Sequence, residues 1–185
     1  MKTEITGVVL AGGKSTRMGE DKSTMLFQNQ QLIQYSINVL EPFCKEILIS
    51  SNNNKHHHFN HKIIPDEYTD IGPIAGLYSA LKNITTNYLF ILPCDSPKVT
   101  SQFIQYLISE IDNRYDILVP QYNHFLEPLF AIYHKRTLTL IEQQIKEKDY
   151  KLKHLLQQAN TKIVDVEDSN CFVNINTKKD YNNCL

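Results

Sequence analysis

A glycine-rich turn with basic residues follows an apolar run in the stretch VVLAGGKSTRMGEDK, residues 8–22. The apolar run suits a buried strand, and the backbone N–H groups of the turn after it can surround phosphate oxygens. Arg17 offers a planar set of donors and Lys22 a compact positive charge, and both suit a phosphate chain. The stretch therefore predicts a loop that holds a phosphorylated ligand.

Two stricter phosphate-binding motifs do not fit this stretch. A P-loop ending at Gly13-Lys14-Ser15 requires a glycine five positions before Gly13, where Val8 stands. The dinucleotide fingerprint requires glycines spaced as G-x-G-x-x-G, whereas Gly12 and Gly13 are adjacent. The remaining interpretation is a looser glycine turn after the first strand of a sheet.

Asp95 comes directly after the apolar run YLFIL, in the segment PCDSP. Pro93 and Pro97 restrict the backbone on both sides, which gives the carboxylate a fixed place at the end of a buried strand. Such a group suits Mg²⁺, which takes one or two carboxylates and completes its shell with water and substrate phosphates. Aspartate also caps its own turn through a local hydrogen bond, and the sequence leaves this alternative open.

Polar residues follow two further strand-like runs. Asp66 comes after KIIP, and Asn174 and Asn176 lie in FVNINT. In an open α/β sheet, ligands bind just beyond the carboxyl ends of the strands. We therefore expect these residues, Asp95 and the glycine turn to surround one cleft.

The elements that position these residues are predicted from apolar periodicity. Short continuous apolar runs alternate with amphipathic stretches, which is typical of an α/β fold with a mostly parallel sheet and helices on both faces. The pattern predicts strands over 4–10, 46–50, 62–66, 88–93, 116–120 and 161–166. It predicts helices over 31–43, 72–83, 101–111, 135–148 and 151–158.

Two later segments refine this pattern. The run FLEPLFAIYH, residues 125–134, has strand character and predicts a small antiparallel insertion. The stretch NINTKKDYNN, residues 174–183, predicts a closing helix with Thr177 as its N-cap and Asp180 three residues on.

The length and charge of the chain limit the number of domains and the kinds of partner that we expect. A chain of 185 residues buries about 70% of its unfolded surface, so we expect a single domain over 1–185. Its 19 basic and 20 acidic residues show no segregated basic face, which argues against a nucleic-acid partner. No segment approaches the roughly 20 apolar residues of a membrane span, so we expect a cytoplasmic protein with no membrane partner.

The cysteines and histidines do not predict a metal site or a nucleophile. The cysteines lack C-x-x-C pairing and zinc spacing, which predicts free thiols at Cys44, Cys94, Cys171 and Cys184. We expect an exposed loop with no metal around a cluster made of His56, His57, His58 and His61. No histidine adjoins a serine or cysteine in a nucleophile turn, so covalent catalysis has no support.

Four motifs, LAGGKSTRMGEDK, PDEYTDIGPIAGL, PCDSP and FVNINT, give the sequence a family resemblance. Their order and separations resemble those of molybdenum cofactor guanylyltransferases, from Ile5 to about Tyr181. The resemblance implies a Rossmann-like nucleotidyltransferase fold and transfer of GMP from GTP to the terminal phosphate of molybdopterin, with release of pyrophosphate. It implies Mg²⁺ as the cofactor. It also implies that the protein partners are other molybdenum cofactor biosynthesis proteins or acceptor molybdoenzymes.

The resemblance also implies roles for single residues. On the nucleotide side it implies guanosine contacts from Leu10, Ala11 and Gly12, phosphate contacts from Gly13, Arg17 and Lys22, and nucleotide binding by Asp66. It implies that Asp95 holds the metal and that Asn174 and Asn176 lie on the pterin side or near the metal. Some relatives have an asparagine directly after the second strand, and here either Ser50 or Asn52 replaces it.

Two other functions remain as alternatives. One is a cytidylyltransferase that acts on the same cofactor or on another phosphorylated small molecule. The doubled glycine of LAGG and the asparagine of NINT argue against it, because such relatives often carry alanine and aspartate there. The other is a nucleotide-binding regulatory module without turnover, against which the presence of Lys22 and Asp95 argues.

Overall fold

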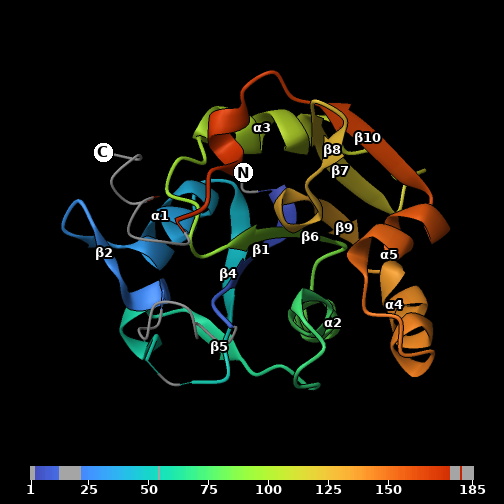
Figure 1. Ribbon diagram of the computed structural model, residues 1–185, viewed down its shortest axis with the longest axis horizontal. Coiled ribbons are helices and arrows are strands. Elements are labelled where there is room, and N and C mark those ends of the chain that lie inside the picture. The colour runs from blue at the N-terminus through green and yellow to red at the C-terminus, as the bar shows by residue number, and fades with distance from the viewer. Residues whose placement is uncertain (1–2, 13–21, 54, 176–179, 181–185) are drawn as a thin grey trace.

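The computed structural model describes residues 3–12, 22–53, 55–175 and 180 (Figure 1). Among these residues, an eight-stranded sheet runs in the order β10-β7-β9-β6-β1-β4-β5, with β8 paired to β7. Its strands are β1 (Thr3–Leu10), β4 (Cys44–Ser50), β5 (Lys62–Ile64), β6 (Tyr88–Pro93), β7 (Ile117–Tyr122), β8 (Phe125–Leu126), β9 (Ile132–His134) and β10 (Thr161–Asp165). All strands predicted from the apolar runs are present.

The middle of the sheet is parallel and buried on both faces. β1 pairs in parallel with β4 and with β6. The neighbouring residues Val8 and Val9 point to opposite faces of the sheet, and both are fully buried. A strand buried in this way needs a layer of helices on each face, which is why its sequence shows a continuous apolar run.

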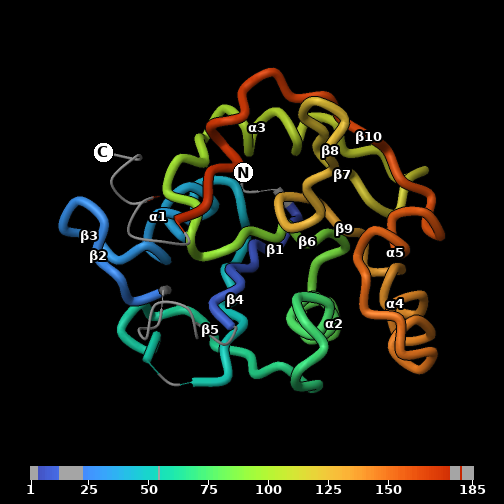
Figure 2. Tube along the Cα trace, viewed as in Figure 1, coloured from blue at the N-terminus to red at the C-terminus, as the bar shows by residue number. Residues whose placement is uncertain are grey.

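Five helices in the described part of the chain form these two layers: α1 (Leu32–Leu40), α2 (Pro73–Asn83), α3 (Ser101–Ser109), α4 (Thr137–Lys146) and α5 (Leu152–Gln158). α1 and α3 cover one face, where Ile37 and Leu107 join the core with Val9. α2, α4 and α5 cover the other, where Leu77 and Leu155 pack with Val8. The two layers are visible on either side of the sheet in Figure 2.

The helix boundaries follow from local chemistry. α1 ends at Leu40, three residues before the predicted end. Glu41 is still helical, with φ −56° and ψ −37°, but Pro42 has no N–H with which to continue the hydrogen bonds of the helix. α3 begins after Thr100, whose hydroxyl accepts a hydrogen bond from the N–H of Phe103 at 3.2 Å.

The segment predicted as an antiparallel insertion is divided in two. Pro128 opens a 3₁₀ turn, η3 (Pro128–Phe130), that separates β8 from β9. β9 pairs antiparallel with both β6 and β7, so it lies inside the central sheet. The antiparallel prediction is confirmed, and the segment is part of the main sheet.

A short hairpin that the apolar pattern did not predict lies outside this sheet. It is formed by β2 (Leu26–Phe27) and β3 (Gln30–Gln31). Gln28 and Asn29 between them have φ values of 49° and 65°, the left-handed geometry of a tight hairpin turn.

Thr177, the predicted cap of the closing helix, lies outside the described residues, and Asp180 is described as helical. Within the described residues, no helix has the length and apolar character needed to cross a membrane.

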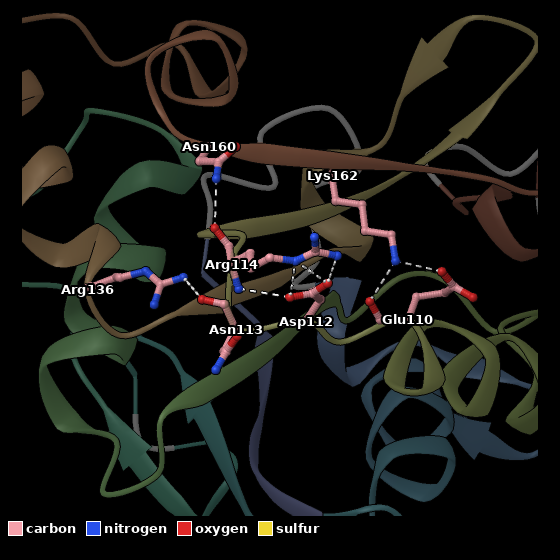
Figure 3. A network of polar contacts seen from close by, with 7 residues as sticks. All are labelled: Glu110, Asp112, Asn113, Arg114, Arg136, Asn160 and Lys162. Carbon is pink, nitrogen blue, oxygen red and sulfur yellow. Dashed lines mark hydrogen bonds and ion pairs between the residues drawn. The ribbon is translucent and has the colours of Figure 1, made fainter.

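A polar network fixes the edge of the sheet at which β7 and β10 begin, and Figure 3 shows part of it, with Arg136 donating to Asn113 and Asn160 donating to Arg114. Arg136 forms an ion pair with Asp116 and donates to the carbonyls of Asn113 and Tyr115, both at 2.6 Å. The backbone N–H of Asn160 donates to the same Asp116 carboxylate at 3.0 Å. These bonds tie the turn before β7 to the segments that lead into α4 and β10.

Candidate functional site

Four strand ends meet at the carboxyl edge of the sheet. The N–H of Ala11, just after β1, donates to the carbonyl of Ser50 at the end of β4, at 2.9 Å. On the other side of β1, the N–H of Cys94 donates to the carbonyl of Leu10 at 3.0 Å. The N–H of Ser51 donates to the carbonyl of Ile64 at the end of β5, also at 3.0 Å. The residues predicted at these ends are therefore neighbours.

Asp66 is held by both residues that were candidates for the asparagine position. The hydroxyl of Ser50 donates to Asp66 Oδ1 at 2.7 Å, and the backbone N–H of Asp66 donates to Asn52 Oδ1 at 2.8 Å. Partial burial raises the pKa of Asp66 above its usual value of 3.8, and the bond from Ser50 opposes this rise. Ser50 thus orients the carboxylate, while the exposed Asn52 fixes the backbone beneath it.

Two glycines allow close packing around this carboxylate. A Cβ atom on Gly76, in the first half of α2, would lie 2.8 Å from both Leu10 Cδ2 and Ser50 Oγ. A Cβ atom on Gly12 would lie 3.4 Å from Asp66 Oδ2, which places the glycine turn beside Asp66. Gly76 was not predicted as a site residue, although a glycine inside a helix is a signal for close approach.

The FVNINT segment joins the edge next to Asp95. The N–H of Ile175 donates to the carbonyl of Asp95 at 2.9 Å. The hydroxyl of Ser96 donates to Asn174 Oδ1 at 2.5 Å, although the two residues are 78 positions apart. Asp95 and Asn174 are both partly buried. The structure therefore places Asn174 close to Asp95, the candidate metal ligand. Ser96, which holds Asn174 there, was not predicted from the sequence.

The end of the glycine-rich stretch is described from Lys22, which begins the 3₁₀ turn η1 (Lys22–Thr24). Ser23 is buried, and its hydroxyl lies 3.3 Å from Nε2 of the fully buried His56. The prediction of an exposed loop is therefore wrong for His56, while His57 and His58 are exposed. His56 is buried because it packs under the turn that carries Lys22.

Four residues on which predictions were made lie outside the described part of the chain: Gly13, Arg17, Asn176 and Cys184. The three cysteines in the described part of the chain, Cys44, Cys94 and Cys171, are buried free thiols, as predicted. Within the same part, no group of three or more histidine, cysteine, aspartate or glutamate residues is arranged to hold a metal ion. A metal ligand set built from protein alone is therefore absent from the described residues.

Comparisons with known proteins agree on one family. The model of the MobA-like NTP transferase domain matches residues 7–163. A molybdenum cofactor guanylyltransferase of Vibrio atlanticus is 34% identical over 184 residues, which cover 97% of this chain and 95% of the relative. A probable molybdenum cofactor guanylyltransferase of Bacillus mycoides is 32% identical over 189 residues, with 97% and 94% covered.

A solved structure extends this similarity to the fold. The crystal structure of molybdopterin-guanine dinucleotide biosynthesis protein A from Archaeoglobus fulgidus superposes with a TM-score of 0.82 at 25% sequence identity. The superposition covers 96% of this chain and 95% of that one. The similarity in fold therefore extends over nearly the whole chain.

Proposed function

Because this chain belongs to the MobA-like NTP transferase family, together with the molybdenum cofactor guanylyltransferases, we propose that it transfers GMP from GTP to the terminal phosphate of molybdopterin. Pyrophosphate leaves, and molybdopterin guanine dinucleotide forms. The observation that carries the proposal is the meeting of Gly12, Asp66, Asp95 and Asn174 at one edge of the sheet.

The nucleoside half of the proposed site lies over β1, β4 and β5. Leu10, Ala11 and Gly12 present backbone there, and Asp66 supplies a carboxylate whose position Ser50 fixes. A carboxylate can accept from the N1–H and 2-amino groups of guanine, and a base without these donors would leave it unsatisfied. Asp66 is accordingly our candidate for base or ribose recognition, with Asn52 exposed beside it.

The phosphate half would be formed by Gly13, Arg17 and Lys22. The positive charges of Arg17 and Lys22 would neutralise the triphosphate and the departing pyrophosphate, as in other phosphoryl transfers, while Gly13 would offer its backbone N–H. The acceptor is itself a phosphate whose oxygen is already ionised, so the reaction requires no enzyme nucleophile and no strong general base. Alignment and charge compensation are then the main tasks of the protein.

Asp95 is our candidate for holding Mg²⁺. A single carboxylate at the end of a buried strand fits this ion, because Mg²⁺ retains water and substrate phosphates as most of its ligands. When bound, the ion would supply positive charge at the transferred phosphate. Asp95 would keep its place through Ile175 and Ser96 would hold Asn174, which together with Asn176 would face the acceptor.

We extend the proposal to the setting of the reaction. Residues 1–185 would form one domain, and the buried free thiols of Cys44, Cys94 and Cys171 suit the reducing conditions of the cytoplasm. Cofactor biosynthesis proteins or acceptor molybdoenzymes would deliver the pterin or receive the product.

Pyrophosphate release with each nucleoside triphosphate tests the proposal. The protein, Mg²⁺ and molybdopterin should release pyrophosphate with GTP and much less with CTP, and Asp95→Ala should abolish release while retaining the melting temperature. Preference for CTP would support the cytidylyltransferase alternative. Nucleotide binding without release would support the regulatory module.

A further inference from the structure

Glu127 is a partly buried carboxylate at the carboxyl edge that the sequence did not single out. Its backbone N–H donates to the carbonyl of Pro120 at 3.0 Å. Among the residues that the structure describes, none forms a hydrogen bond or an ion pair with its side chain, and burial alone raises its pKa. An ionised group that loses water without gaining a partner costs free energy, and a ligand that donates to it would recover that cost.

The register of the sheet places Glu127 on the face covered by α1 and α3. β8 pairs antiparallel with β7 through Gln121 and Leu126, and the bond to Pro120 continues this ladder. Directly opposed residues of an antiparallel pair project to the same face, so Glu127 projects with Pro120. Two residues earlier on β7, Leu118 faces the core under α1 and α3.

The segment that carries Asn174 lies on this same face. It follows β10, passes over α3 and ends beside α1 (Figures 1 and 2). The ring of Phe172 packs against that of Phe130, with 5.2 Å between centroids, and Phe130 lies three residues after Glu127. Asn174 follows Phe172 by two residues and accepts from Ser96 beside Asp95. Glu127 and Asn174 thus lie three and two residues along the chain from the two rings of this contact.

Glu127 lies on the opposite side of Asp95 from the nucleoside half of the site. In the strand order, β4 and β5 lie beyond β1 on one side of β6, and β9 and β7 lie on the other. Ser50 and Asp66 belong to the first group, and Glu127, between β8 and η3, belongs to the second. With GTP over β1 and β4, the acceptor would approach Asp95 from the side of the sheet that carries Glu127.

We propose that Glu127 binds the pterin ring of the acceptor by accepting hydrogen bonds from its 2-amino and N3–H groups. This inference rests on the proposed function. The terminal phosphate of molybdopterin would be repelled by a carboxylate, whereas the far end of the molecule presents two adjacent N–H donors that match carboxylate oxygens. Glu127 would thus orient the acceptor so that its phosphate points toward Asp95.

The test compares Glu127→Gln with the unmodified protein and with Glu41→Gln. The glutamine has the same shape but loses the charge, and it presents an N–H group to the donors of the ring. Glu41 is an exposed residue at the end of α1, at the opposite edge of the sheet, and serves as the matched control. Affinities for molybdopterin and for GTP are measured separately by equilibrium binding, without turnover.

We expect Glu127→Gln to weaken molybdopterin binding by about tenfold to hundredfold, the usual range for a hydrogen bond to a charged group. Its affinity for GTP and its melting temperature should equal those of Glu41→Gln. Unchanged molybdopterin affinity in Glu127→Gln, or equal loss of both affinities, would overturn the assignment.

A second measurement uses pterin and lumazine as competing ligands. Lumazine has a carbonyl where pterin has the 2-amino group, so the unmodified protein should prefer pterin and Glu127→Gln should lose this preference. An equal preference in both proteins would contradict the inference. These binding measurements do not depend on turnover. If no pyrophosphate is released with any nucleotide, the proposed function fails, but the binding measurements still test whether Glu127 contacts the pterin ring.

Discussion

Ser50 donates its hydroxyl to Asp66 across the carboxyl ends of β4 and β5, with 2.7 Å between Ser50 Oγ and Asp66 Oδ1. This bond joins a strand end to the first turn beyond the next strand. Gly76 of α2 lies directly against it, since an added Cβ would come within 2.8 Å of the same hydroxyl. The geometry of Asp66 therefore depends on three separate segments.

Asp66→Asn should weaken GTP binding without lowering the stability of the fold. Asparagine keeps an oxygen for Ser50 but removes a charge whose burial raises the pKa of Asp66. Since the folded pKa is raised, the favourable contribution of Asp66 to stability is fully present below pH 3.8 and is lost as pH rises through the folded pKa. Above that pH, the variant should melt at an equal or higher temperature than the unmodified protein.

Melting curves from about pH 4 to about pH 8, with and without GTP, check this prediction. Glu147→Gln changes an exposed carboxylate at the end of α4 and should leave both the melting temperature and the GTP shift unchanged. A variant at Asp66 that melts lower at every pH, or that keeps the full GTP shift, would contradict the role given to this residue.

Gly76→Ala should destabilise the protein. The new methyl group would overlap Leu10 and Ser50, and overpacking of this kind costs about 1–3 kcal/mol, against about 1 kcal/mol gained from helix propensity. Gly12→Ala is the matched comparison, because its Cβ would meet Asp66 at an ordinary 3.4 Å. Urea unfolding should therefore show a larger loss of stability for Gly76→Ala, and the reverse order would refute the packing argument.

Ser96→Ala should impair use of the acceptor more than binding of GTP. It removes the 2.5 Å bond to Asn174 and loosens the segment after η4 (Ser169–Phe172), which stays bonded to the Asp95 carbonyl through the N–H of Ile175. We expect a loss of about 1 kcal/mol in the transition state, seen as a fall of about fivefold in kcat/KM for molybdopterin. Ser109→Ala removes a hydroxyl that donates to the Tyr106 carbonyl on the exposed side of α3, and it should leave kcat/KM unchanged. Equal kinetics for the two variants would argue against the role of Ser96.

Arg136→Ala should lower stability and leave turnover per folded molecule unchanged. It removes the ion pair with Asp116 and two bonds to carbonyls, at the edge of the sheet opposite the site. We expect a loss of about 1–2 kcal/mol, because bonds from a charged donor are involved but the side chain is partly exposed. Arg114→Ala removes the pair between an exposed guanidinium and Asp112 together with a cation–π contact to Tyr115, and should cost less than Arg136→Ala. A fall in kcat for Arg136→Ala would show that the network acts on the site.

The buried parallel strands were predictable because they leave a local signal. Val8 and Val9 must both be apolar when helices cover both faces, so β1 appears as a continuous run. The position of β9 inside the sheet was harder to predict from the sequence, because it depends on long-range pairing of Ile132 with Phe90 and Leu118. The hairpin of β2 and β3 was missed because its turn uses Gln28 and Asn29 in place of glycine.

The place of a candidate residue in the fold could be predicted where a strand end and a polar residue coincide in sequence, as at Asp66 and Asp95. It was missed where the contact joins distant segments. His56 lies in a polar stretch that suggests exposure, yet it is buried, with its ring beside Ser23, 33 residues away, and stacked on Phe59. Glu127 lacks a signal of this kind altogether, because its environment depends on the pairing of β8 with β7.

The most direct test of the proposed reaction is detection of its two products in one mixture. Purified protein is incubated with Mg²⁺, molybdopterin and GTP labelled in the α-phosphate, and both pyrophosphate and labelled pterin are quantified. Guanylyl transfer predicts one molybdopterin guanine dinucleotide for each pyrophosphate released. Release of pyrophosphate without label on the pterin, or no release at all, would contradict it.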